Sequence, residues 1–125
     1  MHRQPRDRIE RIGRTIVHSA IKVHRALGPG LLESVYQSCL GYELESRGLE
    51  VEYEVKIPVR YRGLSIDNGY RADMLVSHEV VVENKAVERL VPVHTAQILT
   101  YLELGGYKLG VLAVPLCVSA TDVVD

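Results

Sequence analysis

Three ionisable side chains interrupt two short apolar segments near the middle of the chain. Asp73 lies within residues 71–76, and Glu83 and Lys85 lie within residues 80–85. A charged group on a buried strand is costly unless it is paired or binds a cation. Two carboxylates beside a lysine are groups that metal-assisted hydrolysis of phosphate esters uses. A cross-strand charge network without chemistry is the plain alternative, and spacing alone leaves both interpretations open.

The loop between the two segments decides whether the carboxylates share a face. If residues 77–79 form a three-residue loop, a β-hairpin results in which Asp73 lies directly opposite Glu83. A two-residue loop would separate the carboxylates and also divide the apolar face. We therefore predict the three-residue register, with Lys85 on the carboxylate face, opposite Arg71. The other face then carries four apolar side chains and one asparagine: Met74, Val76, Val80, Val82 and Asn84.

Like charges placed directly across a strand pair are destabilising without a compensating cation. A divalent cation would supply that charge to Asp73 and Glu83, and a site built from oxygen ligands suits Mg²⁺ or Mn²⁺ rather than Zn²⁺. A lysine beside such a cation can orient a water or stabilise the charge that develops on a phosphoryl oxygen. The predicted cofactor is therefore Mg²⁺ or Mn²⁺.

Hydrophobic periodicity predicts two helices before these residues. Apolar side chains three or four positions apart indicate an amphipathic helix over residues 8–27, ended by Gly28-Pro29-Gly30. A second helix is expected over residues 32–47, with Gly48 as its C-terminal stop. Its inward side chains would be Val35, Tyr36, Cys39, Leu40 and Leu44.

The remaining elements are read as strands and one further helix. Alternation predicts a strand over residues 51–57 with one buried face, and Pro58 marks an edge or a bulge. After a turn at Arg62-Gly63 and a polar stretch, strands are expected over residues 71–76 and 80–86. A helix over 93–104 and a strand over 108–114 follow. The order ααβββαβ predicts a single α/β domain, a mixed β-sheet flanked by helices.

Composition restricts the classes of protein. The 125 residues are 46% hydrophobic and 25% charged, as expected for one small domain with its own core. Cys39 and Cys117 have neither metal-site nor redox-motif spacing, so we expect core thiols. The sequence contains no apolar run of about 18 residues and begins with a charged segment. We expect a cytoplasmic protein with no membrane partner.

Charge is distributed unevenly along the chain. Residues 1–25 carry seven basic and two acidic side chains, whereas the remainder carries eight basic and fourteen acidic ones. A basic face on the first helix could follow a phosphate backbone. A solvated helix face explains the same pattern. The long amphipathic helix would also suit a homodimer interface.

Several segments, in order and in spacing, resemble a known family. Asp73 followed by Glu83-Asn84-Lys85, between an upstream and a downstream helix, is similar to the metal-binding core of the PD-(D/E)XK nuclease superfamily. Residues 30–36, GLLESVY, resemble the signature of its small bacterial and archaeal GxxExxY family. The resemblance covers about residues 8–114 and implies a restriction-endonuclease-like core in one domain, 1–125, with a divergent tail over 115–125. Asn84 departs from the family, which usually has an apolar residue there.

The resemblance implies a role for each matching position. Asp73, Glu83 and Glu33 would be metal ligands, and Lys85 with Gln97 would act in catalysis, Gln97 as part of an element resembling QxxxY. Three further side chains would bind substrate: Arg71, His94 and Tyr101. From the residues alone, Glu33 is a carboxylate favoured at a helix start. His94, Gln97 and Tyr101, on the third helix, fit equally well as polar residues at the border between the buried and exposed faces of that helix.

The function implied by the resemblance is that of a metal-dependent nuclease that hydrolyses phosphodiester bonds of nucleic acid, with DNA favoured over RNA. One alternative is a catalytically silent module that binds nucleic acid or protein, which the lack of an overall basic excess supports. The retained Asp73, Glu83 and Lys85 argue against it. Another alternative is a toxin-like or antitoxin-like small protein that works as an oligomer.

Overall fold

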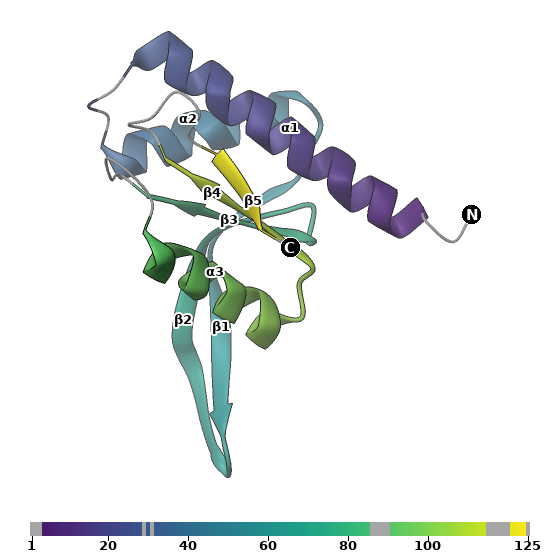
Figure 1. Cartoon of the computed structure of the whole chain (residues 1–125), viewed down its shortest axis with the longest axis vertical. Helices are drawn as coiled ribbons and strands as arrows, with labels where there is room; N and C mark the ends of the chain where they lie inside the picture. The colour runs from purple at the N-terminus through teal and green to yellow at the C-terminus, as the bar shows by residue number, and fades with distance from the viewer. Residues whose placement is uncertain (1–3, 29, 31, 86–90, 115–120, 125) are drawn as a thin grey trace.

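A five-stranded mixed sheet with helices on both faces organises the computed structural model, which describes residues 4–28, 30, 32–85, 91–114 and 121–124 (Figure 1). The strands lie in chain order, and β3 and β4 form the parallel pair because α3 connects them. The elements are α1 (Gln4–Leu27), α2 (Glu33–Ser46), β1 (Val51–Tyr61), β2 (Leu64–Val76), β3 (Val80–Asn84), α3 (Pro92–Gly105), β4 (Leu109–Ala113) and β5 (Thr121–Val124).

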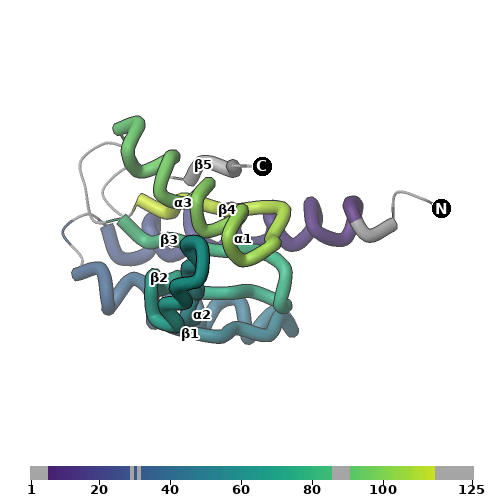
Figure 2. The backbone as a smooth tube through the Cα atoms, turned by 90° about the horizontal axis from the view of Figure 1, so that it is seen from below, coloured from purple at the N-terminus to yellow at the C-terminus, as the bar shows by residue number. Residues whose placement is uncertain are grey.

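Two apolar clusters fix the layers. Helices α1 and α2 pack with Met74, Val76, Val80 and Val82 on one face of the sheet. On the other face, α3 packs with residues that include Leu75 and Val81. Figure 2 shows α2 and α3 on opposite sides of β3. The prediction of a mixed sheet flanked by helices is confirmed.

The first two helices match the expected pattern with two corrections. Helix α1 begins at Gln4, four residues before the expected start, and ends at Leu27, where Gly28 takes a φ of 75°. The prediction that Val35 faces inward was wrong, because its side chain is 42% exposed. The buried line of α2 runs through every fourth position, and Val35 lies about 100° from that line. Its buried side chains include Tyr36, Leu40 and Leu44.

The expected start of the second strand was also wrong. Strand β2 begins at Leu64, so the polar stretch after the Arg62-Gly63 turn pairs with the second half of β1. The Asp67-Asn68-Gly69 segment interrupts the short apolar alternation of Leu64 and Ile66, so the sequence reads there as a turn rather than a strand. The expected irregularity at Pro58 is confirmed, since the register shifts between Ile57 and Val59 where Pro58 offers no N–H.

Strand β1 does not have the single buried face that alternation predicts. Val51 packs against the α1 and α2 cluster, whereas Val55 and Ile57 pack against the α3 cluster. Glu54, between them, has a φ of 53°, a left-handed conformation that non-glycine residues rarely adopt. The β1–β2 ribbon thus turns from one layer to the other at Glu54.

The predicted hairpin register between β2 and β3 is confirmed. Met74 pairs with Val82 and Val76 with Val80, across a loop in which Ser77 and His78 have positive φ. The predicted apolar face packs against α1 and α2.

The end of the chain contains an element that the predicted order lacks. Strand β5 pairs antiparallel with β4, within the segment expected to be a divergent tail. Residues 86–90 and 115–120, with Cys117, lie outside the described residues, as does the expected end of the third strand at residue 86. Among the helices that the structure describes, none combines the length and apolar character of a membrane span.

Leu40→Ala should lower the free energy of unfolding by about 2–5 kcal/mol, because it leaves a cavity beneath α2. Val35→Ala on the same helix should change it by less than about 0.5 kcal/mol, because that side chain is exposed at the surface of α2. Chemical denaturation measures both values. Similar losses for the two variants would contradict this account of how α2 packs.

Candidate active site

Asp73 and Glu83 bind each other's strand through their carboxylates. Backbone pairing between β2 and β3 extends from the loop to Met74 and Val82. Beyond these residues, side-chain carboxylates accept the hydrogen bonds that link the two strands. The Asp73 backbone N–H donates to Glu83 Oε2 at 2.7 Å, and the Asn84 backbone N–H donates to Asp73 Oδ2 at 2.8 Å. These reciprocal bonds hold the two carboxylates side by side, as the register predicted.

Burial makes this pair electrostatically unfavourable. Glu83 is 3% exposed, and burial, followed by the charge of Asp73, raises its pKa to about 7. Burial also raises the pKa of Asp73, although the hydrogen bond from Asn84 opposes that shift. Without an added cation, the pair therefore favours a state with fewer than two negative charges near neutral pH.

Lys85 is held between Glu83 and α3. Its Nζ lies 3.7 Å from Glu83 Oε1 and donates to Gln97 Oε1 at 2.7 Å. Gln97 Nε2 in turn donates to the Tyr101 hydroxyl at 2.9 Å. Because a lysine ammonium can only donate, it requires the oxygen of the Gln97 amide, and the amide nitrogen must face Tyr101. Lys85, Gln97 and Tyr101 therefore form one hydrogen-bonded series.

Tyr101 joins the hydrogen-bonded series of Lys85 and Gln97 to the β1–β2 ribbon. Its ring lies 5.4 Å, centroid to centroid, from the ring of Tyr70 at an interplanar angle of 48°. Burial and then the charge of Glu83 raise the pKa of Tyr101, which keeps the phenol neutral. Sequence reasoning missed Tyr70 because the residues around it were read as a loop.

Asn84 begins a second series of hydrogen-bonded polar side chains, on the α2 side of the sheet. Its Nδ2 donates to Gln37 Oε1 at 3.0 Å and lies 3.4 Å from Met74 Sδ, which confirms the face predicted for it. Gln37 Nε2 donates to Glu54 Oε2 at 3.3 Å. Asn84 is fully buried, and its Oδ1 has no hydrogen-bond partner. Sequence reasoning missed Gln37 and Glu54, and the polar Asn84 on an apolar face was the signal that pointed to a partner.

Arg71 does not lie opposite Lys85, which corrects the register prediction at this position. It pairs across the ribbon with Lys56, and its Nη1 lies 3.6 Å from Glu54 Oε1. The described β2–β3 pairing stops at Met74, so β3 is no longer the neighbour of β2 at Arg71. Arg71 approaches the carboxylate pair through Glu54, whose charge contributes to the raised pKa of Asp73 after burial and Glu33.

Glu33 begins α2, as expected, and is exposed. Its negative charge adds to burial in raising the pKa of both Asp73 and Glu83, so it lies within their electrostatic range. In the described parts of the chain, no three metal-ligating side chains come together as a cluster. The assembled centre is therefore the carboxylate pair.

His94 stands apart from the Lys85 chain in its hydrogen bonding. The Val91 backbone N–H donates to His94 Nδ1 at 3.1 Å at the start of α3. This ring nitrogen satisfies one of the free N–H groups near a helix N-terminus. The interpretation of His94 as a hydrogen-bonded border residue fits this contact.

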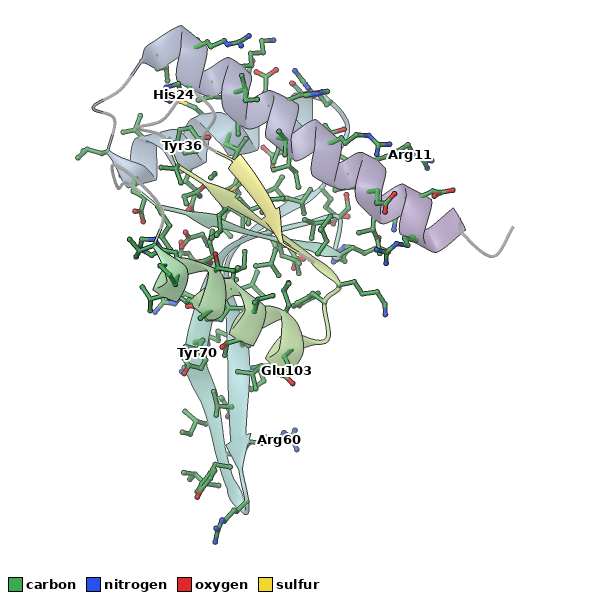
Figure 3. The ribbon with its side chains drawn as sticks, viewed as in Figure 1. Arg11, His24, Tyr36, Arg60, Tyr70 and Glu103 are labelled. Carbon is green, nitrogen blue, oxygen red and sulfur yellow. The ribbon has the colours of Figure 1, made fainter. Side chains whose placement is uncertain are left out.

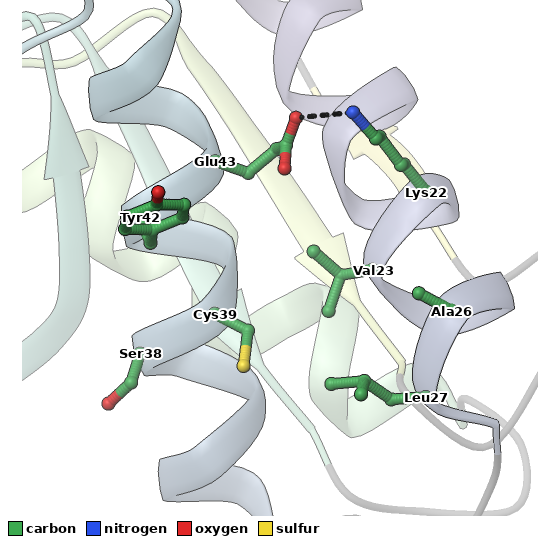
Figure 4. Close-up of a pocket in the computed structure, with 8 residues that line it drawn as sticks. All are labelled: Lys22, Val23, Ala26, Leu27, Ser38, Cys39, Tyr42 and Glu43. Carbon is green, nitrogen blue, oxygen red and sulfur yellow. Dashed lines mark hydrogen bonds and ion pairs between the residues drawn. The ribbon is translucent and has the colours of Figure 1, made fainter.

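A separate pocket of about 330 Å³ opens between α1 and α2. Figure 4 shows Lys22 and Glu43 joined across its rim, with an ion pair of 3.1 Å. Val23, Leu27 and Cys39 contribute to its largely apolar wall. None of the lining residues belongs to the carboxylate centre, so this pocket is not part of the candidate active site.

The chain matches the family model of the PD-(D/E)XK nuclease superfamily over residues 10–114. It therefore belongs to that superfamily, as the Asp73 and Glu83-Asn84-Lys85 segments suggested. No curated protein and no solved structure gives a significant match.

Glu83→Gln should change how stability depends on pH when divalent cations are chelated. The pKa of Glu83 is about 7 in the folded chain, above its ordinary value of 4.5, so the folded state binds this proton more tightly. The stabilisation that this bound proton gives to the folded state is complete below pH 4.5, the ordinary pKa of a glutamate. It is lost as the pH rises through about 7. The variant should gain on the order of 2 kcal/mol relative to wild type across this interval.

Chemical denaturation at a series of pH values measures this difference. Glu103→Gln, at an exposed position on α3, is the matched control and should follow wild type at every pH. Parallel profiles for wild type and Glu83→Gln would contradict the raised pKa.

Proposed function

We propose that the chain is a metal-dependent nuclease that hydrolyses phosphodiester bonds of nucleic acid at the Asp73 and Glu83 pair. The observation that carries this proposal is the reciprocal anchoring of the two carboxylates, with Lys85 beside Glu83. A plain charge network would not require the buried carboxylate of Glu83 to lie beside the partly buried carboxylate of Asp73, at a cost in solvation. Membership of the PD-(D/E)XK nuclease superfamily supports the same assignment.

The donor set fits a hard divalent cation. Asp73 and Glu83 offer carboxylate oxygens, which suit Mg²⁺ or Mn²⁺, and Glu33 is the proposed further ligand from the start of α2. The raised pKa of both paired carboxylates reflects burial and repulsion that a cation would relieve. When bound, such a cation polarises a phosphoryl oxygen and promotes ionisation of the attacking water.

Lys85 is the proposed catalytic lysine. Its ammonium has three donors, of which Gln97 takes one, so donors remain for a phosphoryl oxygen that gains negative charge. Gln97 is a positioning residue in this proposal, because its amide fixes Lys85 and is itself fixed by Tyr101. Arg71, His94 and Tyr101 are proposed to line the substrate path around this centre.

Within the superfamily, we propose membership of the GxxExxY family. The support is residues 30–36, which match its signature and contain Glu33. We also propose that the partner is nucleic acid, with DNA favoured over RNA.

Adding Mg²⁺ or Mn²⁺ should raise the thermal midpoint of wild type, because a ligand that binds the folded state stabilises it by about 2.7 kcal/mol at a hundredfold excess over Kd. Lys85→Ala should keep this rise and lose at least about 100-fold in cutting rate. Glu83→Gln should lose both the rise and the cutting, because it removes a ligand. Lys108→Ala, at an exposed lysine beside β4, is the matched control and should retain both.

Calorimetry and a nuclease assay on single-stranded, duplex and branched substrates measure these outcomes. If wild type cuts none of these substrates, and binds nucleic acid equally well with and without chelator, the chain is a silent binding module instead.

A further inference from the structure

The β1–β2 ribbon continues past α3 as a projecting arm, which we define as residues 56–71 (Figure 1). Its outer pairs are Val59 with Ile66, Arg60 with Ser65, and Tyr61 with Leu64. The side chains at the tip are exposed, with Tyr61 at 63%. The arm is therefore anchored at one end and free to contact a partner at the other.

One face of the arm is basic. Lys56 pairs with Arg71 and Arg60 with Ser65, and strand alternation places these side chains on the same face. Tyr70 belongs to the opposite, apolar face, and Figure 3 shows it and Arg60 on opposite sides of the arm. At the tip, the Arg62 guanidinium lies 5.4 Å from the centre of the Tyr61 ring.

The charge of the arm contrasts with that of the whole chain. The arm carries four basic side chains against one acidic side chain, Asp67, whereas the chain has a net charge of −1. Arg71 is paired with Glu54. Among the described residues, no ion pair engages Lys56, Arg60 or Arg62. Three exposed cations on a projecting ribbon form a surface complementary to a polyanion.

The basic face leads to the candidate active site. Arg71 is two positions from Asp73 on β2, and its Nη1 lies 3.6 Å from Glu54 Oε1. On the apolar face, the ring of Tyr70 contacts Tyr101, which belongs to the hydrogen-bonded chain of Lys85. A polyanion held along the arm would therefore extend toward the carboxylate pair.

We infer that the arm inserts into the major groove of duplex DNA and holds the flanking phosphates through Arg60 and Arg62. This inference rests on the proposed function and names its substrate as double-stranded DNA. The major groove of B-form DNA, about 12 Å wide and about 8.5 Å deep, admits a two-stranded ribbon. From Val59 to the turn at Arg62 the arm extends roughly 10 Å, enough to reach the floor of that groove. The major groove of A-form RNA is too narrow for such a ribbon.

The test is fluorescence anisotropy with a labelled DNA duplex of two helical turns, under chelation so that no cutting is needed. Arg60→Ala/Arg62→Ala should raise Kd at least about tenfold and reduce the slope of log K against log salt by about 2. Both side chains are exposed, so the thermal midpoint should not change. Arg60→Lys/Arg62→Lys should restore most of the affinity, because phosphate contacts need the charge.

Two comparisons separate the arm from general electrostatic attraction. Arg11→Ala/Arg14→Ala removes the same charge from an exposed face of α1 and should leave Kd near the wild-type value. An RNA duplex of equal length and the single DNA strand should bind wild type more weakly than duplex DNA. Binding of these two probes should not respond to the substitutions in the arm.

Equal losses from the α1 and arm variants would overturn the inference. So would equal sensitivity of the RNA duplex or the single strand to the arm substitutions, or failure of wild type to bind duplex DNA. If DNA binding depends on the arm but no DNA is cut, the inference about the arm stands and the proposed nuclease activity is rejected. If wild type cuts DNA but the arm substitutions do not change DNA binding, the inference about the arm is rejected and the proposed nuclease activity stands.

Discussion

The two carboxylates that cross between β2 and β3 are the constraint around which the centre is built. Asp73 Oδ2 and Glu83 Oε2 each accept a backbone N–H from the opposite strand where regular pairing ends. Hydrogen bonds to an ionised acceptor are shorter and stronger than neutral ones, so these bonds offset part of the cost of burying two acids. The remaining cost is visible in the raised pKa of both groups.

Lys85 connects this pair to the rest of the molecule. Its hydrogen bond to Gln97 ties the end of β3 to α3, and Tyr101 extends the connection to Tyr70 on the ribbon. Because lysine only donates, a single amide orientation satisfies the whole chain. The same contacts therefore fix the orientation of Lys85 and join it, through Gln97 and Tyr101, to Tyr70 at the base of the projecting arm.

Asn84 shows how a polar side chain on an otherwise apolar face of β3 is accommodated. Its backbone N–H serves Asp73, and its side chain is held by Gln37 and contacts Met74. One buried acceptor, Oδ1, stays unpartnered, which costs about 1–3 kcal/mol in a buried setting. Gln37 also reaches Glu54, where the ribbon turns between the two layers, so these contacts link α2, β1 and β3.

The sequence by itself determined the hairpin register, the carboxylate pairing and the buried faces of β2 and β3, because strand parity and apolar alternation are local properties. It did not determine the arm, β5 or the exposure of Val35. In the outer part of the ribbon, Pro58 and the Asp67-Asn68-Gly69 segment interrupt the alternation, so the sequence reads there as turns. Only the tertiary structure decided that Gln37 meets both Asn84 and Glu54, and that Tyr70 meets Tyr101. These contacts join residues that are far apart in the chain, and they depend on how the layers pack rather than on any spacing along the sequence.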